Sequence, residues 1–297
     1  MPFRNVIVES PAHITVKNSQ LIIKTDREHA LAVEDISSIL FESRQSTITT
    51  AALSVLGQCG CAVYLCDEKH MPCAVLEPFS QYVRTPHILD LQTGMSEPLR
   101  KRLWQSIVKA KIGNQALCLS FSGKSGADAL KKMASEVLSG DTGNAEATAA
   151  RRYFLSLFDL EFTRDAENGY NAALNYGYAI LRGCAARYLA AYGFMPALGL
   201  QHRSMVNSFN LADDIMEPFR PVIDLLVSNY FDGDELTPDK KRLLFNSLNL
   251  DVLSGGQHHT VAYAMERLVQ SLTRSLEEGK AQLLLPELTE LKQHSYE

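Results

Sequence analysis

The spacing of hydrophobic residues changes once along the chain, and this change limits the fold more than any other feature of the sequence. Before residue 78, β-branched and other apolar residues come in short runs separated by turn-forming residues. Such runs predict short β-strands. From Pro98 onward the apolar residues recur at helical spacing, as Leu99, Leu103 and Ile107 do. We therefore expect an α+β protein, in which a small β-rich N-terminal domain precedes a larger all-helical C-terminal domain.

The β-rich part is expected to form one domain over residues 1–80. Its predicted strands are residues 5–9, 14–17, 20–25, 31–34, 38–42, 62–66 and 73–77, with one short helix at 49–57. These strands carry few charged residues, so their free edges favour pairing with another chain. We therefore predict that this domain is the site of dimerisation.

The rest of the chain is expected to be a linker, residues 81–96, followed by a helical catalytic domain, residues 97–297. The predicted helices are residues 97–118, 127–138, 145–159, 170–192, 222–231, 237–248 and 260–277. The helix at 170–192 contains many small residues and no acidic ones, which indicates a central position with close packing at Gly177. The polar tail from Leu283 onward is expected to fray.

Composition restricts the class of protein. With 46% hydrophobic and 21% charged residues among 297, the chain is typical of a soluble globular protein of up to two domains. It lacks both an apolar stretch long enough to span a bilayer and the pattern of a signal peptide. The net charge of −5 counts against a protein that coats nucleic acid through bulk positive charge. A DNA enzyme with a local basic surface remains compatible with it.

The six cysteines favour a reducing compartment. Four of them are clustered, at Cys59, Cys61, Cys66 and Cys73, but their spacing does not form the paired CxxC pattern of a zinc site. Most cysteines lie in apolar runs, as expected for buried, reduced thiols. We therefore expect a cytoplasmic protein.

One stretch, residues 201–224, gathers the residue types of a divalent-metal site. His202 follows a turn marked by glycine and proline, and three acids come next, at Asp213, Asp214 and Glu217. Pro218 predicts a break at which a helix restarts, and such a break would hold Glu217 in a fixed place. A histidine together with carboxylates suits a divalent cation. Acids before a helix also serve as caps, so both interpretations stay open.

A third candidate ligand lies in the helix predicted at 145–159. Glu146 is in line with Ala149, Tyr153 and Leu157, the apolar stripe that should face the core. A buried carboxylate requires a partner, because an unpaired buried charge costs several kcal/mol. Alternatively, Glu146 is a partly solvated residue of the first helical turn, where the helix dipole stabilises it.

Signatures of other catalytic schemes are absent from the sequence. There is no G-x-S-x-G nucleophile turn, no phosphate-binding G-x-x-x-x-G-K-[ST] loop and no dinucleotide-binding G-x-G-x-x-G. Three basic clusters, at residues 100–102, 151–152 and 240–242, are candidates for phosphate contact. For the first of these clusters, a solvated helix face is the interpretation that the sequence alone favours.

Three segments resemble a known family, the CRISPR-associated integrase that captures new spacers. They read NAEATAARRYF, NAALNYGYAILRG and GLQHRSMVNSFNLADDIMEPFRPVID. The likeness is strongest to the branch that accompanies a single-protein RNA-guided effector nuclease. By this resemblance the catalytic and metal-binding residues are Glu146, His202 and Glu217, and Asp214 matches a neighbouring acid.

The resemblance implies a metal-dependent phosphodiester transesterification with Mn²⁺ or Mg²⁺ as the cofactor. The 3′-hydroxyl of a short double-stranded DNA fragment would attack the phosphodiester at the end of a CRISPR repeat. The implied partners are a second copy of the chain and a small ferredoxin-like adaptation protein, which two dimers flank in a heterohexamer. Whether the effector nuclease joins them stays open. The alternatives are a metal-dependent nuclease that cleaves branched DNA without integration, and a non-catalytic scaffold that holds DNA.

Overall fold

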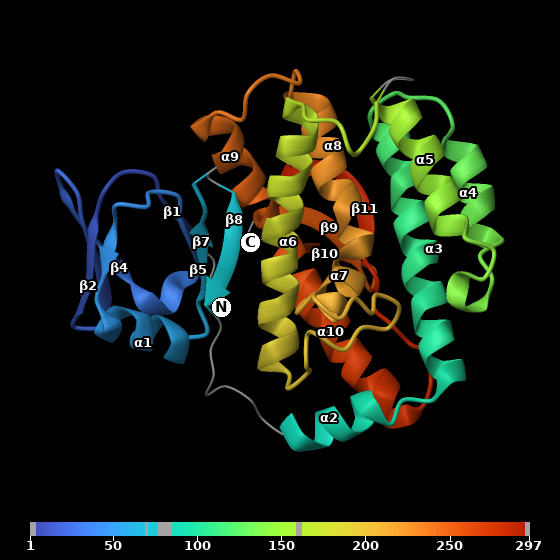
Figure 1. Ribbon diagram of the computed structural model, residues 1–297, viewed down its shortest axis with the longest axis horizontal. Coiled ribbons are helices and arrows are strands. Elements are labelled where there is room, and N and C mark those ends of the chain that lie inside the picture. Colours follow the sequence, from blue (N-terminus) through green and yellow to red (C-terminus); the bar gives the residue numbers. More distant parts are fainter. Residues whose placement is uncertain (1–3, 69–70, 77–84, 159–161, 295–297) are drawn as a thin grey trace. The chain divides into compact units, whose positions relative to one another are not determined.

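The computed structural model describes residues 4–68, 71–76, 85–158 and 162–294, and the chain divides into two compact units. The first, Met1–Val83, is β-rich, and the second, Arg84–Glu297, is mostly helical (Figure 1). The predicted α+β class, with a small β-rich part before a larger helical one, is confirmed.

The first unit contains two four-stranded sheets and one α-helix among its described residues. One sheet has the spatial order β1 (Arg4–Val8), β5 (Ile36–Phe41), β7 (Ala62–Cys66) and β8 (Pro72–Leu76). The other has the order β4 (Glu28–Ala32), β3 (Gln20–Lys24), β2 (His13–Lys17) and β6 (Thr47–Ile48). Strands β1, β5 and β7 are parallel, and β8 returns antiparallel to β7. Helix α1 (Thr50–Gln58) contacts β2 and β7, and a 3₁₀ turn, η1 (Val33–Asp35), precedes β5.

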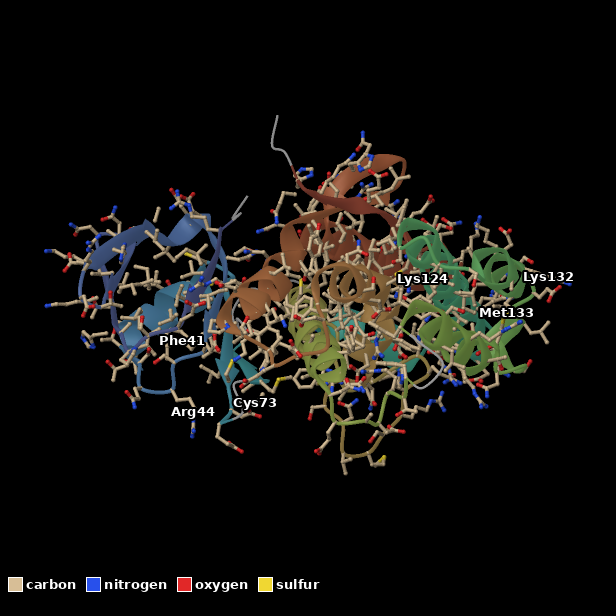
Figure 2. All side chains as sticks on the ribbon, turned by 90° about the horizontal axis from the view of Figure 1, so that it is seen from above. Phe41, Arg44, Cys73, Lys124, Lys132 and Met133 are labelled. Atoms are coloured by element: carbon tan, nitrogen blue, oxygen red, sulfur yellow. The ribbon has the colours of Figure 1, made fainter. Side chains whose placement is uncertain are left out.

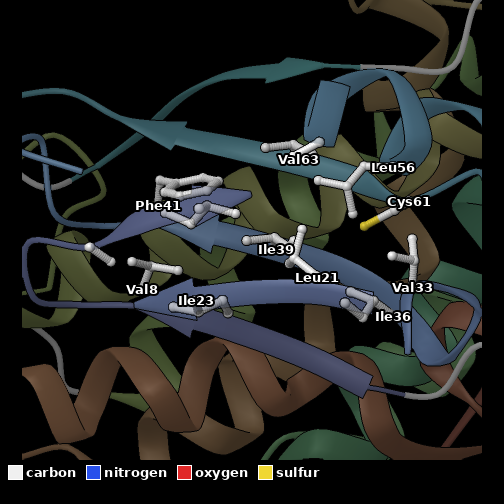
Figure 3. Close-up of a cluster of buried hydrophobic side chains, with 13 residues drawn as sticks. Val8, Leu21, Ile23, Val33, Ile36, Ile39, Phe41, Leu56, Cys61 and Val63 are labelled. Carbon is white, nitrogen blue, oxygen red and sulfur yellow. The ribbon is translucent and has the colours of Figure 1, made fainter. Parts of the chain in front are cut away.

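A core of buried hydrophobic side chains stabilises this unit. Leu21, Ile36, Ile39 and Leu56 have no exposed surface and point toward one another from both sheets and from α1 (Figure 3). The buried thiol of Cys61 belongs to the same cluster. The six cysteines form no disulfide within the described residues, as expected for reduced thiols, although two of them are exposed. The seven predicted strands correspond to β1 to β5, β7 and β8, while the two-residue β6 was too short to predict.

The second unit is built from helices of very different length. Its α-helices are α2 (Thr85–Thr93), α3 (Glu97–Phe121), α4 (Ala127–Ser135), α5 (Ala145–Leu157), α6 (Gly169–Ala191), α7 (Asn210–Met216), α8 (Arg220–Tyr230), α9 (Pro238–Phe245) and α10 (Val261–Glu278). Three 3₁₀ turns are η2 (Ser139–Asp141), η3 (Glu217–Phe219) and η4 (Asn246–Asn249).

Helix α6 lies at the centre of this unit, as its composition predicts. It packs against α7, α8, α9 and α10 (Figure 1). Gly177 makes the approach to α8 possible, since a Cβ there would lie 2.5 Å from Cγ2 of Ile223. Helix α3, the longest in the described chain, contacts α5, α8 and η3, so it touches every element that carries a candidate carboxylate ligand.

The second unit also contains elements that the sequence did not predict. A three-stranded antiparallel sheet has the order β10 (Gln257–Thr260), β9 (Leu250–Ser254) and β11 (Glu287–Gln293). The expectation that the tail frays from Leu283 is therefore wrong, because β11 pairs with β9 and buries Leu288. Helix α2 lies within the segment expected to be a linker, residues 81–96. Among the helices of the described residues, none has the length and apolar character needed to cross a membrane.

Candidate active site

The acidic stretch near residue 217 lies where one helix gives way to the next. Helix α7 ends at Met216, the 3₁₀ turn η3 covers Glu217–Phe219, and α8 starts at Arg220. The predicted break at Pro218 is thus confirmed as a single 3₁₀ turn, which proline tolerates at its start. The break holds Glu217 inside the protein, with a side chain that is 2% exposed.

Glu146 lies in the first turn of α5, and its backbone is held by Asp141 in the turn before the helix. The two carboxylate oxygens of Asp141 accept hydrogen bonds from the backbone N–H groups of Ala145 and Glu146, at 2.8 and 3.0 Å. Because Asp141 caps the helix, the Glu146 side chain is free to turn inward. It is 24% exposed, which agrees with its position in line with the buried Ala149 and Tyr153.

A lysine connects these two glutamates. The ammonium Nζ of Lys111, on α3, is 2.6 Å from Oε1 of Glu146 and 2.6 Å from Oε2 of Glu217. The first contact is a hydrogen bond; the second is an ion pair whose angles leave Oε2 without a hydrogen-bond partner among the described residues. Burial alone would lower the pKa of Lys111, but Glu217 and Glu146 outweigh it and raise the pKa above 10.5.

Two neighbouring cations stabilise the ionised form of the Glu217 carboxyl group. The guanidinium of Arg220 lies 3.0 Å from its Oε1, opposite the contact with Lys111. Burial would raise the pKa of Glu217, but Arg220 and Lys111 together lower the pKa below its usual 4.5. Arg220 itself stacks over the ring of Tyr178, 4.8 Å from the ring centre, which fixes the orientation of its guanidinium.

His202 is held by Asp214 from the side of Nδ1. The fully buried carboxylate of Asp214 lies 2.7 Å from Nδ1 of His202 and accepts hydrogen bonds from the backbone N–H groups of Leu200, Gln201 and His202. Asp214 therefore organises the loop that carries the histidine. Its carboxylate occupies the position of an orienting second partner, which fixes the ring of a metal-binding histidine in many proteins.

The other ring nitrogen of His202 is left available. The side chain is 41% exposed, and Nε2 makes no hydrogen bond with a residue that the structure describes. The ring meets Trp104 edge-on, with centroids 6.0 Å apart. The hydrogen bond with Asp214 raises the pKa of His202 above 6.5, against the effect of burial. Burial in turn raises the pKa of Asp214, against its hydrogen bond with His202.

The loop between α6 and α7 is anchored from distant parts of the chain. Gln92, on α2, donates to the carbonyls of Met195 and Leu198 and accepts from the N–H of Met195, at 2.9 to 3.0 Å. Gly199 has no room for a side chain, because a Cβ would lie 2.3 Å from the carbonyl oxygen of His202. This part of the loop is therefore rigidly placed, and a surface pocket of about 370 Å³ opens beside His202.

The third acid of the stretch, Asp213, faces a different set of partners. It accepts from Nε of Arg182 at 2.6 Å and from Nδ2 of Asn207 at 2.7 Å. Its role is to attach α7 to α6 and to the loop. Sequence reasoning missed Lys111 and Arg220, although Lys111 shares the helical spacing of its apolar neighbours, which was a usable signal.

The three basic clusters differ in the exposure and ion pairing of their side chains. Arg100 is largely buried: it pairs with Glu97 and donates to the carbonyl of Leu200 at 3.0 Å, so it supports the loop. In the cluster at 240–242, Lys240 and Arg242 form ion pairs with acids of the same region. The side chains at 151–152 are exposed. These side chains, together with the exposed Arg102 of the first cluster, are the best placed for contact with a phosphate.

Further exposed cations lie nearby in the chain. Figure 2 shows Lys132 on α4 and Lys124 in the turn before it, and both side chains are exposed. These lysines extend the set of basic residues beyond the clusters that the sequence singled out. A polyanion could therefore be held locally despite the net charge of −5.

The chemical types of the candidate ligands suit a hard divalent cation. Two carboxylates already share one positive charge, and His202, whose pKa the charge of Glu217 helps to raise, offers Nε2. They are not preassembled, since the described residues contain no group of three or more His, Cys, Asp or Glu that could hold a metal ion as placed. The ammonium of Lys111 lies 2.6 Å from both Glu146 and Glu217.

Comparison with known proteins covers almost the whole chain. Residues 6–247 match the family described as CRISPR associated protein Cas1. The chain is 43% identical to the CRISPR-associated endonuclease Cas1 of Neisseria meningitidis serogroup C (strain 8013), and the match covers 100% of both proteins.

Solved structures show the same fold. A casposase bound to integration product has a TM-score of 0.78 at 18% identity, covering 95% of this chain and 92% of that one. A Cas6-RT-Cas1–Cas2 complex has a TM-score of 0.70 at 19% identity, covering 96% of this chain and 36% of that one. At such identities the likeness concerns the fold.

Proposed function

Because the chain belongs to the Cas1 family of CRISPR-associated proteins, we propose that it is a metal-dependent DNA integrase and endonuclease that inserts short foreign DNA fragments into a CRISPR array. One observation carries the proposal: Glu146 and Glu217 converge on a single cation, and the charge of Glu217 acts on a histidine oriented through Nδ1. The sequence resemblance selects these same three residues as the metal ligands. The name of the 43% identical relative, an endonuclease, supports the same class of activity.

In the proposed reaction, the 3′-hydroxyl of the fragment attacks the phosphodiester at the end of a repeat. A new phosphorus–oxygen bond forms while the bond to the leaving 3′-oxygen breaks, so no protein side chain is joined to DNA. Glu146 and Glu217 would hold Mn²⁺ or Mg²⁺ through their carboxylates, and His202 through Nε2. When bound, the cation would supply Lewis-acid stabilisation of the phosphate charge. Asp214 keeps the Nδ1 proton in place and thereby directs the lone pair of Nε2 outward.

The proposal extends to partners. We infer a homodimer that forms through the β-rich unit, and two such dimers on a small ferredoxin-like adaptation protein, acting in the cytoplasm. The matched Cas6-RT-Cas1–Cas2 complex, whose name includes Cas2, supports a partner of that kind. The substrates would be double-stranded DNA fragments and the repeat DNA of the array.

A half-site integration assay tests the function. Wild type, Glu146→Ala, His202→Ala and Glu217→Ala are mixed with a labelled fragment and a repeat-bearing plasmid, with and without Mn²⁺. We expect joined product only from wild type with metal. His87→Ala is a matched control, because that histidine is 54% exposed and meets only Glu277 at 3.8 Å among the described residues. Normal joining by any of the three site variants would refute the assignment of that residue.

A nuclease that cleaves branched DNA without joining strands is the second candidate, favoured by the relative's name. The two functions differ in product, which the same gel resolves: a joined strand in one case and only shortened strands in the other. A non-catalytic scaffold would bind DNA equally with and without Mn²⁺ and yield neither product.

A further inference from the structure

Lys111 is the most unusual charged residue of the second unit outside the expected ligand set. Its side chain is 9% exposed, and it extends from the middle of the long helix α3. Its Nζ lies 2.6 Å from each of two carboxylates that come from α5 and η3. Buried ammonium groups are rare without such pairing, because the loss of hydration must be compensated.

The two carboxylates depend on this lysine to different degrees. Glu217 has a second cation, Arg220, at 3.0 Å. For Glu146, Lys111 is the one cation within ion-pair distance among the described residues. Without the ammonium, two negative charges would face each other in a poorly hydrated place, and their repulsion would push the site apart.

The contact with Glu217 is incomplete. Its Oε2 is buried and makes no hydrogen bond that meets normal geometry, although Nζ is only 2.6 Å away. An ammonium donates along tetrahedral directions, whereas a spherical ion has no such directional requirement. A spherical cation in the place of Nζ would therefore meet the same carboxylate oxygens and balance the same negative charge.

We propose that Lys111 is a resident counter-cation of the Glu146–Glu217 pair, which a divalent metal ion must displace to bind. The proposal rests on the proposed function, since it assumes that these carboxylates hold the metal. It gives the lysine two effects. Lys111 keeps the metal-free site assembled, and it weakens the apparent metal affinity by competition for the same oxygens. Its flexible four-carbon stem allows the ammonium to leave while α3 stays in place.

Lys111→Met tests both effects, because methionine fills similar volume without the charge. In metal-free buffer its melting temperature should fall below that of wild type, and Mn²⁺ should raise it by more than it raises wild type. In calorimetric titration its Mn²⁺ dissociation constant should be at least tenfold lower than that of wild type. Lys101→Met is the matched control, since it removes an exposed lysine from the same helix, 3.6 Å from Glu97. It should leave both quantities unchanged.

A second variant covers the case in which Lys111→Met does not fold without metal. Lys111→Met with Glu146→Gln removes one charge of each sign, so its metal-free melting temperature should return toward that of wild type and stop responding to Mn²⁺. Equal or weaker Mn²⁺ binding by Lys111→Met, with binding by wild type intact, would overturn the role of Lys111 and leave the proposed function standing. If neither wild type nor any variant binds Mn²⁺, the metal-dependent function itself fails, and this inference with it.

Discussion

At the scale of single residues, the pairing of His202 with Asp214 leads to a prediction about pH. Because Asp214 raises the pKa of His202 above 6.5, the protonated pair stabilises the fold below about pH 6.5, and this contribution is lost as pH rises through the raised pKa. A proton on Nε2 also competes with a metal ion. Integration activity should therefore increase with pH through the same pKa.

Asp214→Asn checks this coupling. The amide keeps the shape of the carboxylate but loses its charge, so the pKa of His202, followed by NMR, should fall toward 6.5. The rise of activity should move to lower pH, and its plateau should decrease by about 10- to 100-fold, as expected when the orienting partner of a ligand is removed. An unchanged pKa of His202 would show that Asp214 acts only as a backbone anchor.

Single residues also differ in whether the sequence could indicate their role in the candidate site. Glu146 was singled out because a charge in an apolar stripe requires a partner, and Glu217 because a proline predicts a helix break, but only the family resemblance selected them as ligands. Lys111 carries the same signal as Glu146, yet the sequence could not show that the two meet, since they are 35 positions apart and on different helices. The role of Asp214 depends on three loop N–H groups that only the folded backbone directs at it.

At the scale of elements, α2 determines where the loop of His202 lies. Gln92 is 7% exposed and makes three hydrogen bonds to the turn at Met195 and Leu198. In Gln92→Leu these backbone groups lose their partner, so amide hydrogen exchange should accelerate across the turn and toward His202. Turnover should fall more than DNA affinity. Thr93→Val is the control, because the Thr93 hydroxyl bonds only within α2.

Exchange rates equal to wild type in Gln92→Leu would show that Gly199 and Asp214 suffice to hold the loop. The sequence could not predict this anchor, because residues 81–96 contain a proline and a turn-like pair that favour a linker. Short helices were missed for a related reason. In α7, acidic residues occupy buried positions, and their partners, Arg182 and the His202 loop, come from elsewhere in the chain.

At the scale of the whole molecule, the two units differ in their content: the helical unit contains every candidate active-site residue, and the β-rich unit contains none. The described edges of the two sheets are β1 and β8 in one, and β4 and β6 in the other. Unpaired strand edges without a protecting cover favour association with another chain. Among the large apolar side chains of the described strands, that of Leu65 on β7 is the most exposed, at 45%.

We therefore expect dimerisation to require the β-rich unit and not the helical one. Light scattering of the full chain should give twice its 33.0 kDa mass, whereas a chain limited to residues 84–297 should be monomeric and still bind Mn²⁺. The reason is that the second unit has its own core and carries all three predicted ligands. A monomeric full chain at micromolar concentration would contradict the role given to the β-rich unit. A dimeric 84–297 fragment would move the interface to the helices.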